Sequence, residues 1–239
     1  MEFRCKQFAL NHSASTMKVG TDSILLASFL NEFFKEEHAA KIHSVLDVGT
    51  GCGIIALCCA QIFRQADILG IDTDKNSVDE SNDNFRNSPW KERLSAKQIS
   101  FQDLASEEGE NFDLIVSNPP YFTNSLLSAD ERKNSARHNH SLPTEAFVLS
   151  GEKLSSPASH IAVILPCKES MDLEKKFSAC GLFPVYSVLI YPKPYSEAIR
   201  VVIIFSKQGK FSKRQSFFIR NQDNTYSSEY KTLTDKFLL

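Results

Sequence analysis

The sequence predicts an α/β protein with a mostly parallel sheet and helices on both of its faces. Short apolar runs typical of buried strands alternate with longer stretches that have helical spacing. This alternation favours parallel strands joined by crossover helices. The last two apolar runs, 184–191 and 198–206, leave no room for a helix between them, which predicts an antiparallel hairpin at the edge of the sheet.

The elements follow one another along a single domain of residues 1–239, because one α/β domain can use a chain of this length. Residues 1–43 form an N-terminal extension, and residues 44–239 form the core. In the extension, apolar residues at helical spacing predict a helix over 22–34, with Thr21 or Asp22 as its cap. In the core we expect strands over 44–48, 68–72, 96–102, 113–117 and 161–165 before the hairpin, and helices over 54–63, 76–87 and 170–179.

The charge of the chain says little about its partners. The formal net charge is only -2, but from residue 191 onward nine Lys and Arg residues face only four acids. A basic C-terminal third could meet a phosphate backbone, although charge alone favours an ordinary solvated face.

The cysteines and the hydropathy pattern indicate the compartment. The six cysteines form no Cys-x-x-Cys pair, so we expect reduced, packed thiols in a cytoplasmic protein and no metal site. The N-terminus is too polar for a signal peptide. No apolar stretch approaches the ~20 residues that a membrane span needs, so no membrane partner is expected.

A glycine-rich loop joins the first strand to its helix. Asp47 precedes Gly49, Gly51 and Gly53, and glycines at alternate positions let the backbone turn tightly against a ligand. The third glycine comes one residue too early for the dinucleotide fingerprint, and no Gly-Lys-Ser/Thr follows. The loop resembles the first motif of class I S-adenosylmethionine-dependent methyltransferases. The alternative is a strand–helix turn that binds nothing.

Two further acids follow at the expected ends of the next strands. A carboxylate at Asp72 can accept two hydrogen bonds from a ribose diol, and Asp103 is expected to accept from an adenine amino group. Either acid alone is more often a solvated strand end. Together with Asp47 they would lie at the carboxyl edge of the sheet, where ligands bind in such folds.

The segment Asn118-Pro119-Pro120-Tyr121 follows a buried apolar run. Prolines cannot donate to a ladder, so the chain leaves the sheet at Asn118 in an extended conformation. The side-chain oxygen of Asn118 and the carbonyl of Pro119 then face outward as two acceptors, and Tyr121 adds a flat ring. This arrangement suits a planar group that carries an NH2, although a strand-ending turn remains the alternative.

Taken together, these motifs resemble class I methyltransferases that act on amino groups. That resemblance implies a Rossmann-like, seven-stranded sheet with an antiparallel edge hairpin. The string Lys18-Val19-Gly20-Thr21-Asp22 resembles the N-terminal signature of bacterial tRNA (adenine-N6) methyltransferases, which act on valine tRNA at the adenosine just 3′ of the anticodon. The tail departs slightly, because Leu239 stands where a Tyr is usual.

The resemblance implies roles for several residues. S-adenosyl-L-methionine would be held by Lys18, Gly20 and Thr21 as well as by the glycine loop, the two acids and Asn118. Asn118, Pro119, Pro120 and Tyr121 would be catalytic. A monomer would bind the tRNA anticodon stem-loop. The candidate substrate-binding residues are Arg137 and His138, shortly after the Asn-Pro-Pro-Tyr segment, and Lys193 and Arg200 of the basic C-terminal third. The alternative for each is an ordinary surface residue.

Three other functions remain open from the sequence. A protein-glutamine N5 methyltransferase shares Asn-Pro-Pro-Tyr, but such enzymes carry a separate N-terminal helical domain, and the first 43 residues are few for one. Another nucleic-acid amino methyltransferase would use the same loop. A non-enzymatic tRNA-binding scaffold would not need the intact Asp47, glycine loop and Asn118.

Overall fold

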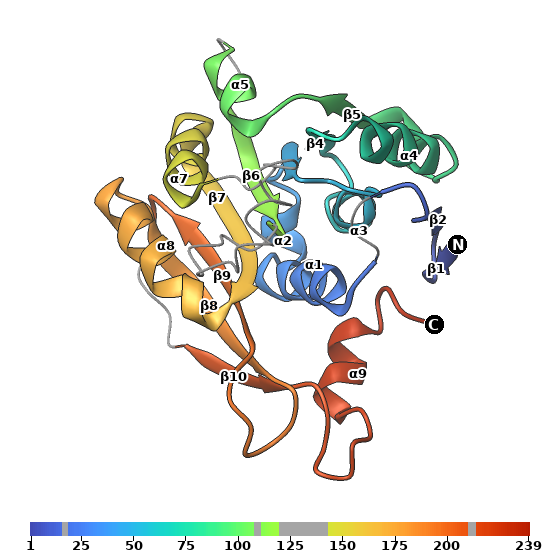
Figure 1. Cartoon of the computed structure of the whole chain (residues 1–239), viewed down its shortest axis with the longest axis vertical. Coiled ribbons are helices and arrows are strands. Elements are labelled where there is room, and N and C mark those ends of the chain that lie inside the picture. The colour runs from blue at the N-terminus through green and yellow to red at the C-terminus, as the bar shows by residue number, and fades with distance from the viewer. Residues whose placement is uncertain (16–18, 108–110, 120–142, 210–213) are drawn as a thin grey trace, which may run out of the picture.

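The computed structural model of the chain has a twisted central sheet covered by helices on both faces (Figure 1). It describes residues 1–15, 19–107, 111–119, 143–209 and 214–239. Strands buried on both faces read as nearly continuous apolar runs, which is why the pattern predicted them well. The strand Arg200–Ser206, for example, buries Val202 and Ile204 in one core cluster and Val201, Ile203 and Phe205 in the other.

The order of the strands in the main sheet is β10-β8-β9-β7-β6-β3-β4-β5. Only β9 runs antiparallel to its neighbours, so the α/β class, the mostly parallel sheet and the antiparallel hairpin are confirmed. The sheet has eight strands among the described residues rather than seven, because β10 pairs in parallel with β8 and covers the expected edge. The strands are β3 (Ser44–Val48), β4 (Asp67–Asp72), β5 (Leu94–Gln98), β6 (Phe112–Ser117), β7 (Ser155–Pro166), β8 (Phe183–Tyr191), β9 (Arg200–Ser206) and β10 (Gln215–Phe218).

The helices divide between the two faces of the sheet. One core cluster joins the sheet to α1, α3, α4 and α9, and the other joins it to α5, α7 and α8. The helices are α1 (Thr21–Phe33), α2 (Glu36–Ala39), α3 (Ile54–Ile62), α4 (Lys75–Arg86), α5 (Phe101–Ser106), α7 (Thr144–Lys153), α8 (Cys167–Ala179) and α9 (Ser228–Thr234), with a 3-10 turn at Lys91–Arg93.

Two sequence expectations are wrong at the boundaries of elements. The strand expected over 96–102 ends at Gln98, because Ser100 caps α5 by accepting a hydrogen bond from the backbone of Asp103. The first helix begins at Thr21 with Gly20 as its N-cap residue, and no side chain caps it. Asp22 is the second residue of the helix, and its carboxylate accepts a hydrogen bond from Arg200.

Both ends of the chain pack against the core. Strands β1 (Glu2–Arg4) and β2 (Ala9–Asn11) form a small antiparallel sheet, and β2 contacts α4. Phe237, in the segment after α9, is fully buried. All six cysteines are free thiols, as expected. No helix in the described ranges is long and apolar enough to cross a membrane.

Candidate active site

The glycine-rich loop between β3 and α3 is tied to the neighbouring strand. The backbone N–H groups of Gly49 and Thr50 both donate to the carbonyl of Ile71, each at 2.9 Å. Gly49, Gly51 and Gly53 all have positive φ, at 74°, 55° and 84°, a region that favours glycine. The sequence therefore needs glycine at these three positions for backbone reasons alone.

The surroundings of the three glycines differ. A Cβ at Gly53 would lie 2.5 Å from the ring of Phe85, so this glycine allows the loop to pack against α4. A Cβ at Gly49 or Gly51 would meet nothing within 4 Å. The backbone at these two positions is therefore open to a ligand, whereas Gly53 serves packing.

Asp47 at the end of β3 is completely buried and holds the loop in shape. Its Oδ2 accepts hydrogen bonds from Thr50 Oγ1 at 2.8 Å and from the backbone N–H of Ala56 at 3.1 Å. Its Oδ1 is buried with no hydrogen-bond partner among the described residues. Burial raises the pKa of Asp47 to about 7, against the lowering effect of the bonds from Thr50 and Ala56. Asp47 therefore stabilises the loop from the protein interior and is not an exposed residue at the strand end.

Asp72 at the end of β4 faces the same loop. One carboxylate oxygen accepts from the backbone N–H of Gly51 at 3.0 Å, and the other accepts from the backbone N–H of Asp74 at 3.0 Å. The side chain is half-buried. Each oxygen retains a lone pair, so a diol could bind here only by sharing the carboxylate with the loop.

Asp103 lies in the first turn of α5 instead of at a strand end. It is exposed, and its carboxylate accepts a hydrogen bond of 2.6 Å from the hydroxyl of Ser100. The backbone N–H of Ile99, just before this helix, donates to the carbonyl of Asp72. The start of α5 is thereby held close to the end of β4, and Asp103 stays at the same edge of the sheet as Asp47 and Asp72.

Asn118 comes directly after β6 and meets the first turn of α1. Its Nδ2 lies 3.5 Å from Ser23 Oγ, which makes a long hydrogen bond. Because the amide nitrogen points to Ser23, the Oδ1 atom is directed elsewhere as an acceptor. The preceding Ser117 donates its hydroxyl to the carbonyl of Val48 at 2.8 Å, and Pro119 is buried. Gly20 and Thr21, at the start of α1, therefore lie near Asn118.

Arg200 is paired rather than displayed on a basic surface. Its Nε lies 2.8 Å from Oδ2 of Asp22, and both side chains are about three-quarters buried, at 22% and 25% exposed. Arg200 lies at the rim of the site, where it braces α1. Lys193 is exposed in the loop between β8 and β9.

A second buried acid holds the N-terminal segment, and the sequence analysis missed it. Glu80 of α4 accepts hydrogen bonds from the backbone N–H groups of Ser13, Ala14 and Ser15, between 2.7 and 2.9 Å. Burial raises the pKa of Glu80, but these hydrogen bonds outweigh it and hold the pKa below its ordinary value.

One turn further along α4, Asn84 extends this attachment. Its side chain exchanges two hydrogen bonds of 2.8 Å with the backbone of Asn11 and donates a third to the carbonyl of Cys52 in the glycine loop. A Glu and an Asn at i and i+4 on the packed face of a helix are the only sequence signal for this role. The two residues hold the N-terminal segment beside the glycine loop.

Several expected site residues lie outside the described residues. They are Lys18, Pro120, Tyr121, Arg137 and His138.

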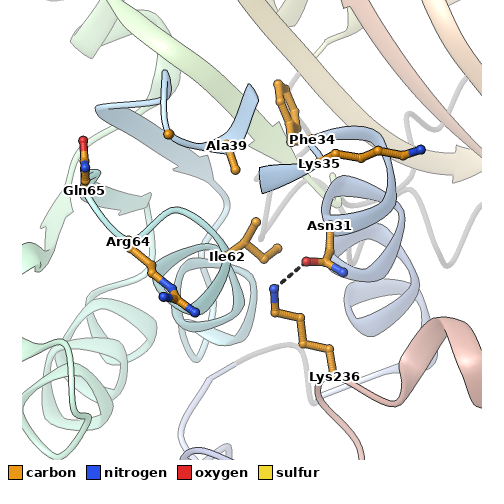
Figure 2. A pocket seen from close by; sticks show the side chains of 9 residues that line it. Asn31, Phe34, Lys35, Ala39, Ile62, Arg64, Gln65 and Lys236 are labelled. Carbon is orange, nitrogen blue, oxygen red and sulfur yellow. Dashed lines mark hydrogen bonds between the residues drawn. The ribbon is translucent and has the colours of Figure 1, made fainter. Parts of the chain in front are cut away.

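A cavity of about 560 Å³ lies elsewhere, at the C-terminal ends of α1 and α3 (Figure 2). Figure 2 shows the hydrogen bond from Lys236 to Asn31 beside Ile62, and Arg64 lines the same cavity. Since α1 and α3 begin at the glycine loop and Asn118, this cavity belongs to the opposite edge of the sheet.

Comparisons with known proteins show similarity to methyltransferases. A family model described as "Methyltransferase small domain" matches residues 12–133. The chain is 33% identical over 239 residues to a tRNA1(Val) (adenine(37)-N6)-methyltransferase from Histophilus somni, and the match covers 100% of this chain and 97% of that protein. A protein with the same name from Bacteroides fragilis is 34% identical over 241 residues, with 99% and 97% covered.

A solved structure of a predicted O-methyltransferase from Agrobacterium tumefaciens has a similar fold. Its TM-score is 0.65 at 16% sequence identity, and the match covers 90% of this chain and 96% of that chain. This likeness concerns the fold alone, which is the α/β Rossmann-like fold of class I methyltransferases. On the full-length sequence matches, the chain belongs to the family of tRNA1(Val) (adenine(37)-N6)-methyltransferases.

Proposed function

We propose that this protein transfers a methyl group from S-adenosyl-L-methionine to N6 of adenosine 37 in tRNA1(Val), the activity that its relatives are named for. The observation that carries the proposal is the meeting of three segments at one edge of the sheet. The glycine loop, the start of α1 and Asn118 are joined there by the contacts of Asp72 with Gly51 and of Asn118 with Ser23.

The residues of the loop suit S-adenosylmethionine as the cofactor. Open space beside Gly49 and Gly51 supports a ligand lying against the loop backbone, and we assign the ribose to Asp72 and the adenine amino group to Asp103. Lys18, Gly20 and Thr21 would lie over the methionine end of the cofactor. The bound cofactor supplies an electrophilic methyl group on a sulfonium centre.

The protein's part in the reaction is to orient the substrate amine. We assign Asn118 Oδ1 and the Pro119 carbonyl as acceptors for the two N–H groups of adenine N6. Holding both N–H groups directs the nitrogen lone pair towards the methyl group and stabilises the positive charge that develops on nitrogen. A strong general base is not required, because the product ammonium is very acidic. Tyr121 would stack on the unpaired base, which costs little to extrude from a loop.

The remaining assignments concern the working form of the enzyme. We propose that residues 1–239 act as one catalytic domain, as a cytoplasmic monomer, on the anticodon stem-loop of the tRNA. The contacts of α4 with residues 11–15 support treating the N-terminal extension as part of that domain. We keep Arg137, His138 and Lys193 as substrate-binding candidates, and give Arg200 an indirect role through Asp22.

The test in cells uses total tRNA from a strain that lacks this protein. Nucleoside mass spectrometry should find N6-methyladenosine missing from tRNA1(Val), and the purified protein with S-adenosylmethionine should restore it. A scaffold would show no saturable binding of S-adenosylmethionine in calorimetry. Unchanged N6-methyladenosine in tRNA1(Val) of the deletion strain would refute the proposal.

A further inference from the structure

The end of β8 projects beyond the level of Asn118 on the same edge of the sheet. Pairing across the sheet sets Ser117 level with Val163, Val163 level with Ile203, and Ile203 level with Ser187. Tyr191, at the end of β8, is four residues past Ser187, which is about 13 Å along the strand. The β8–β9 loop (192–199) therefore extends past the level of Asn118, about three strand spacings of ~4.8 Å to one side.

The chain after β10 lies against this loop. Phe218 pairs with Tyr191, and the backbone N–H groups of Ile219 and Arg220 donate to the carbonyls of Tyr191 and Pro192, both at 3.0 Å. In Figure 1 the β8–β9 loop and the chain between β10 and α9 lie side by side at the bottom of the molecule. Together they form one surface at the same edge of the sheet as the candidate active site.

Tyr195 stands out from the first of these loops. Its side chain is 95% exposed, and its backbone has a positive φ of 64°, which is uncommon for a residue other than glycine. Two prolines, Pro192 and Pro194, stiffen the loop, and the hydroxyl of Ser196 donates to the carbonyl of Lys193 at 2.5 Å. The ring is thus presented to solvent by a constrained backbone.

Two further flat groups belong to the adjoining chain at the end of β10 and just after it. Phe218 is 37% exposed and stacks on Tyr191 with ring centroids 5.1 Å apart. Arg220 lies 4.2 Å from the ring centroid of Tyr226, whose ring also stacks on Tyr230 at 4.7 Å. The Arg220 guanidinium therefore contacts a ring that is itself held by stacking on Tyr230. Its Nη1 is fixed by a hydrogen bond to the carbonyl of Asn224.

We infer that Tyr195, Phe218 and Arg220 form a stacking platform for unpaired bases of the tRNA anticodon loop that neighbour the target adenosine. Unpaired RNA bases are recognised by stacking on aromatic rings and on guanidinium planes. The inference rests on the proposed function, which brings an RNA loop to this edge of the sheet. Lys193, exposed on the same loop, is positioned for the phosphate backbone.

The alternative occupant is a protein partner, and the observations favour RNA. Each member of the platform offers a flat face rather than a convex apolar side chain, and one member is charged. The strand register also puts the platform at the same edge of the sheet as Asn118, about 13 Å further along the strand direction and three strands to one side, which an RNA loop centred on Asn118 can reach.

The test measures binding of unmodified tRNA1(Val) by fluorescence anisotropy at several salt concentrations. Tyr195→Ala should weaken binding about 5- to 150-fold, whereas Tyr195→Phe should bind like the wild type because it keeps the ring. The slope of log affinity against log salt should be the same for Tyr195→Ala and the wild type. Lys193→Gln should make that slope shallower, because it removes a phosphate contact.

The matched control is Phe183→Ala, which removes an aromatic ring 48% exposed at the opposite end of β8. It should leave tRNA affinity unchanged, and all variants should bind S-adenosylmethionine like the wild type. A direct readout is 2-aminopurine, an adenine analogue whose fluorescence falls on stacking, placed in the anticodon loop. The wild type should quench it, and Tyr195→Ala should quench it less.

The outcomes separate this inference from the proposed function. If the wild type binds tRNA1(Val) and Tyr195→Ala shows the same affinity and the same quenching, the platform alone is overturned. A shallower salt slope in Tyr195→Ala overturns it too, because the loss is then electrostatic. No binding of tRNA1(Val) by the wild type overturns the proposed function and the platform together.

Discussion

The Nε of Arg200 and the Oδ2 of Asp22 lie 2.8 Å apart, although 178 residues separate them in the chain. The pair joins the first residue of β9 to the first turn of α1. Since Ser23 in the same turn contacts Asn118, the pair braces the helix that Asn118 contacts. A cation predicted to bind tRNA thus has a partner inside the protein.

The first prediction tests this pair with a double-mutant cycle. Asp22→Asn and Arg200→Gln should each reduce the free energy of unfolding by about 1 kcal/mol, because the pair is partly buried. The double variant should lose less than the sum of the two, with a coupling energy of about 0.5–1.5 kcal/mol. Urea unfolding measures all four proteins. Strictly additive losses would mean that the contact contributes nothing to stability.

The second prediction separates glycines that face a ligand from glycines that serve the backbone. Gly51→Ala should cost about 1–2 kcal/mol of stability through its positive φ and should also weaken binding of S-adenosylmethionine. Gly181→Ala is the matched control, because Gly181 has a φ of 78° and equally open surroundings but lies after α8. Gly181→Ala should lose a similar free energy of unfolding, and calorimetry should show that it binds S-adenosylmethionine as tightly as the wild type. Equal cofactor affinity in the two variants contradicts the assignment.

The third prediction concerns the pH dependence of stability at Asp47. The folded-state pKa is raised from 3.8 to about 7, so the folded protein holds a proton that the unfolded chain releases. The contribution of Asp47 to stability therefore falls as pH rises through this window. Compared with Asp47→Asn, the wild type should lose about 1.4 kcal/mol per pH unit between pH 5 and 6, and about half as much per unit at pH 7, where the folded carboxyl itself titrates.

Asp47→Asn is a suitable reference because Oδ2 of Asp47 accepts both hydrogen bonds. An Asn side-chain oxygen at the same place can accept the same two bonds. Urea unfolding at four pH values measures the difference. A difference that stays flat with pH would show that this carboxyl titrates normally.

The fourth prediction concerns chemistry at Asn118. Asn118→Ala should reduce single-turnover methylation about 100-fold or more, because it removes one preorganised acceptor for the substrate amine. Binding of S-adenosylmethionine should stay within a few-fold of the wild type. Ser23→Ala is the control, since it removes only the contact that orients the amide. It should slow methylation less than Asn118→Ala does, and near-normal rates in Asn118→Ala would rule out the mechanism.

Much of the fold could be predicted because it depends on local patterns. The strands β3, β6 and β9 are buried on both faces and read directly as apolar runs. Strand β10 escaped prediction because it is short and mostly exposed, and its pairing with β8 defines it. The helix at Asp103 escaped because Ser100 ends the strand early through a side-chain cap.

The site was harder to predict where residues depend on distant partners. The glycine loop was recognisable, since positive φ favours glycine at all three positions and Gly53 also lies too close to Phe85 for a Cβ. The sequence could not indicate that Glu80 binds backbone groups 65 to 67 residues away. Nor could it indicate that Arg200 is neutralised by Asp22. Long-range contacts of this kind follow from the fold and have no local signature.

The most direct test of the account is a substrate competition with the purified protein. Unmodified tRNA1(Val), a release factor with an unmodified glutamine, and duplex DNA are offered with labelled S-adenosylmethionine. We predict that only the tRNA is labelled and that digestion yields N6-methyladenosine at position 37, the site named for the relatives. Label on the glutamine or the DNA, with the tRNA left untouched, would contradict the account.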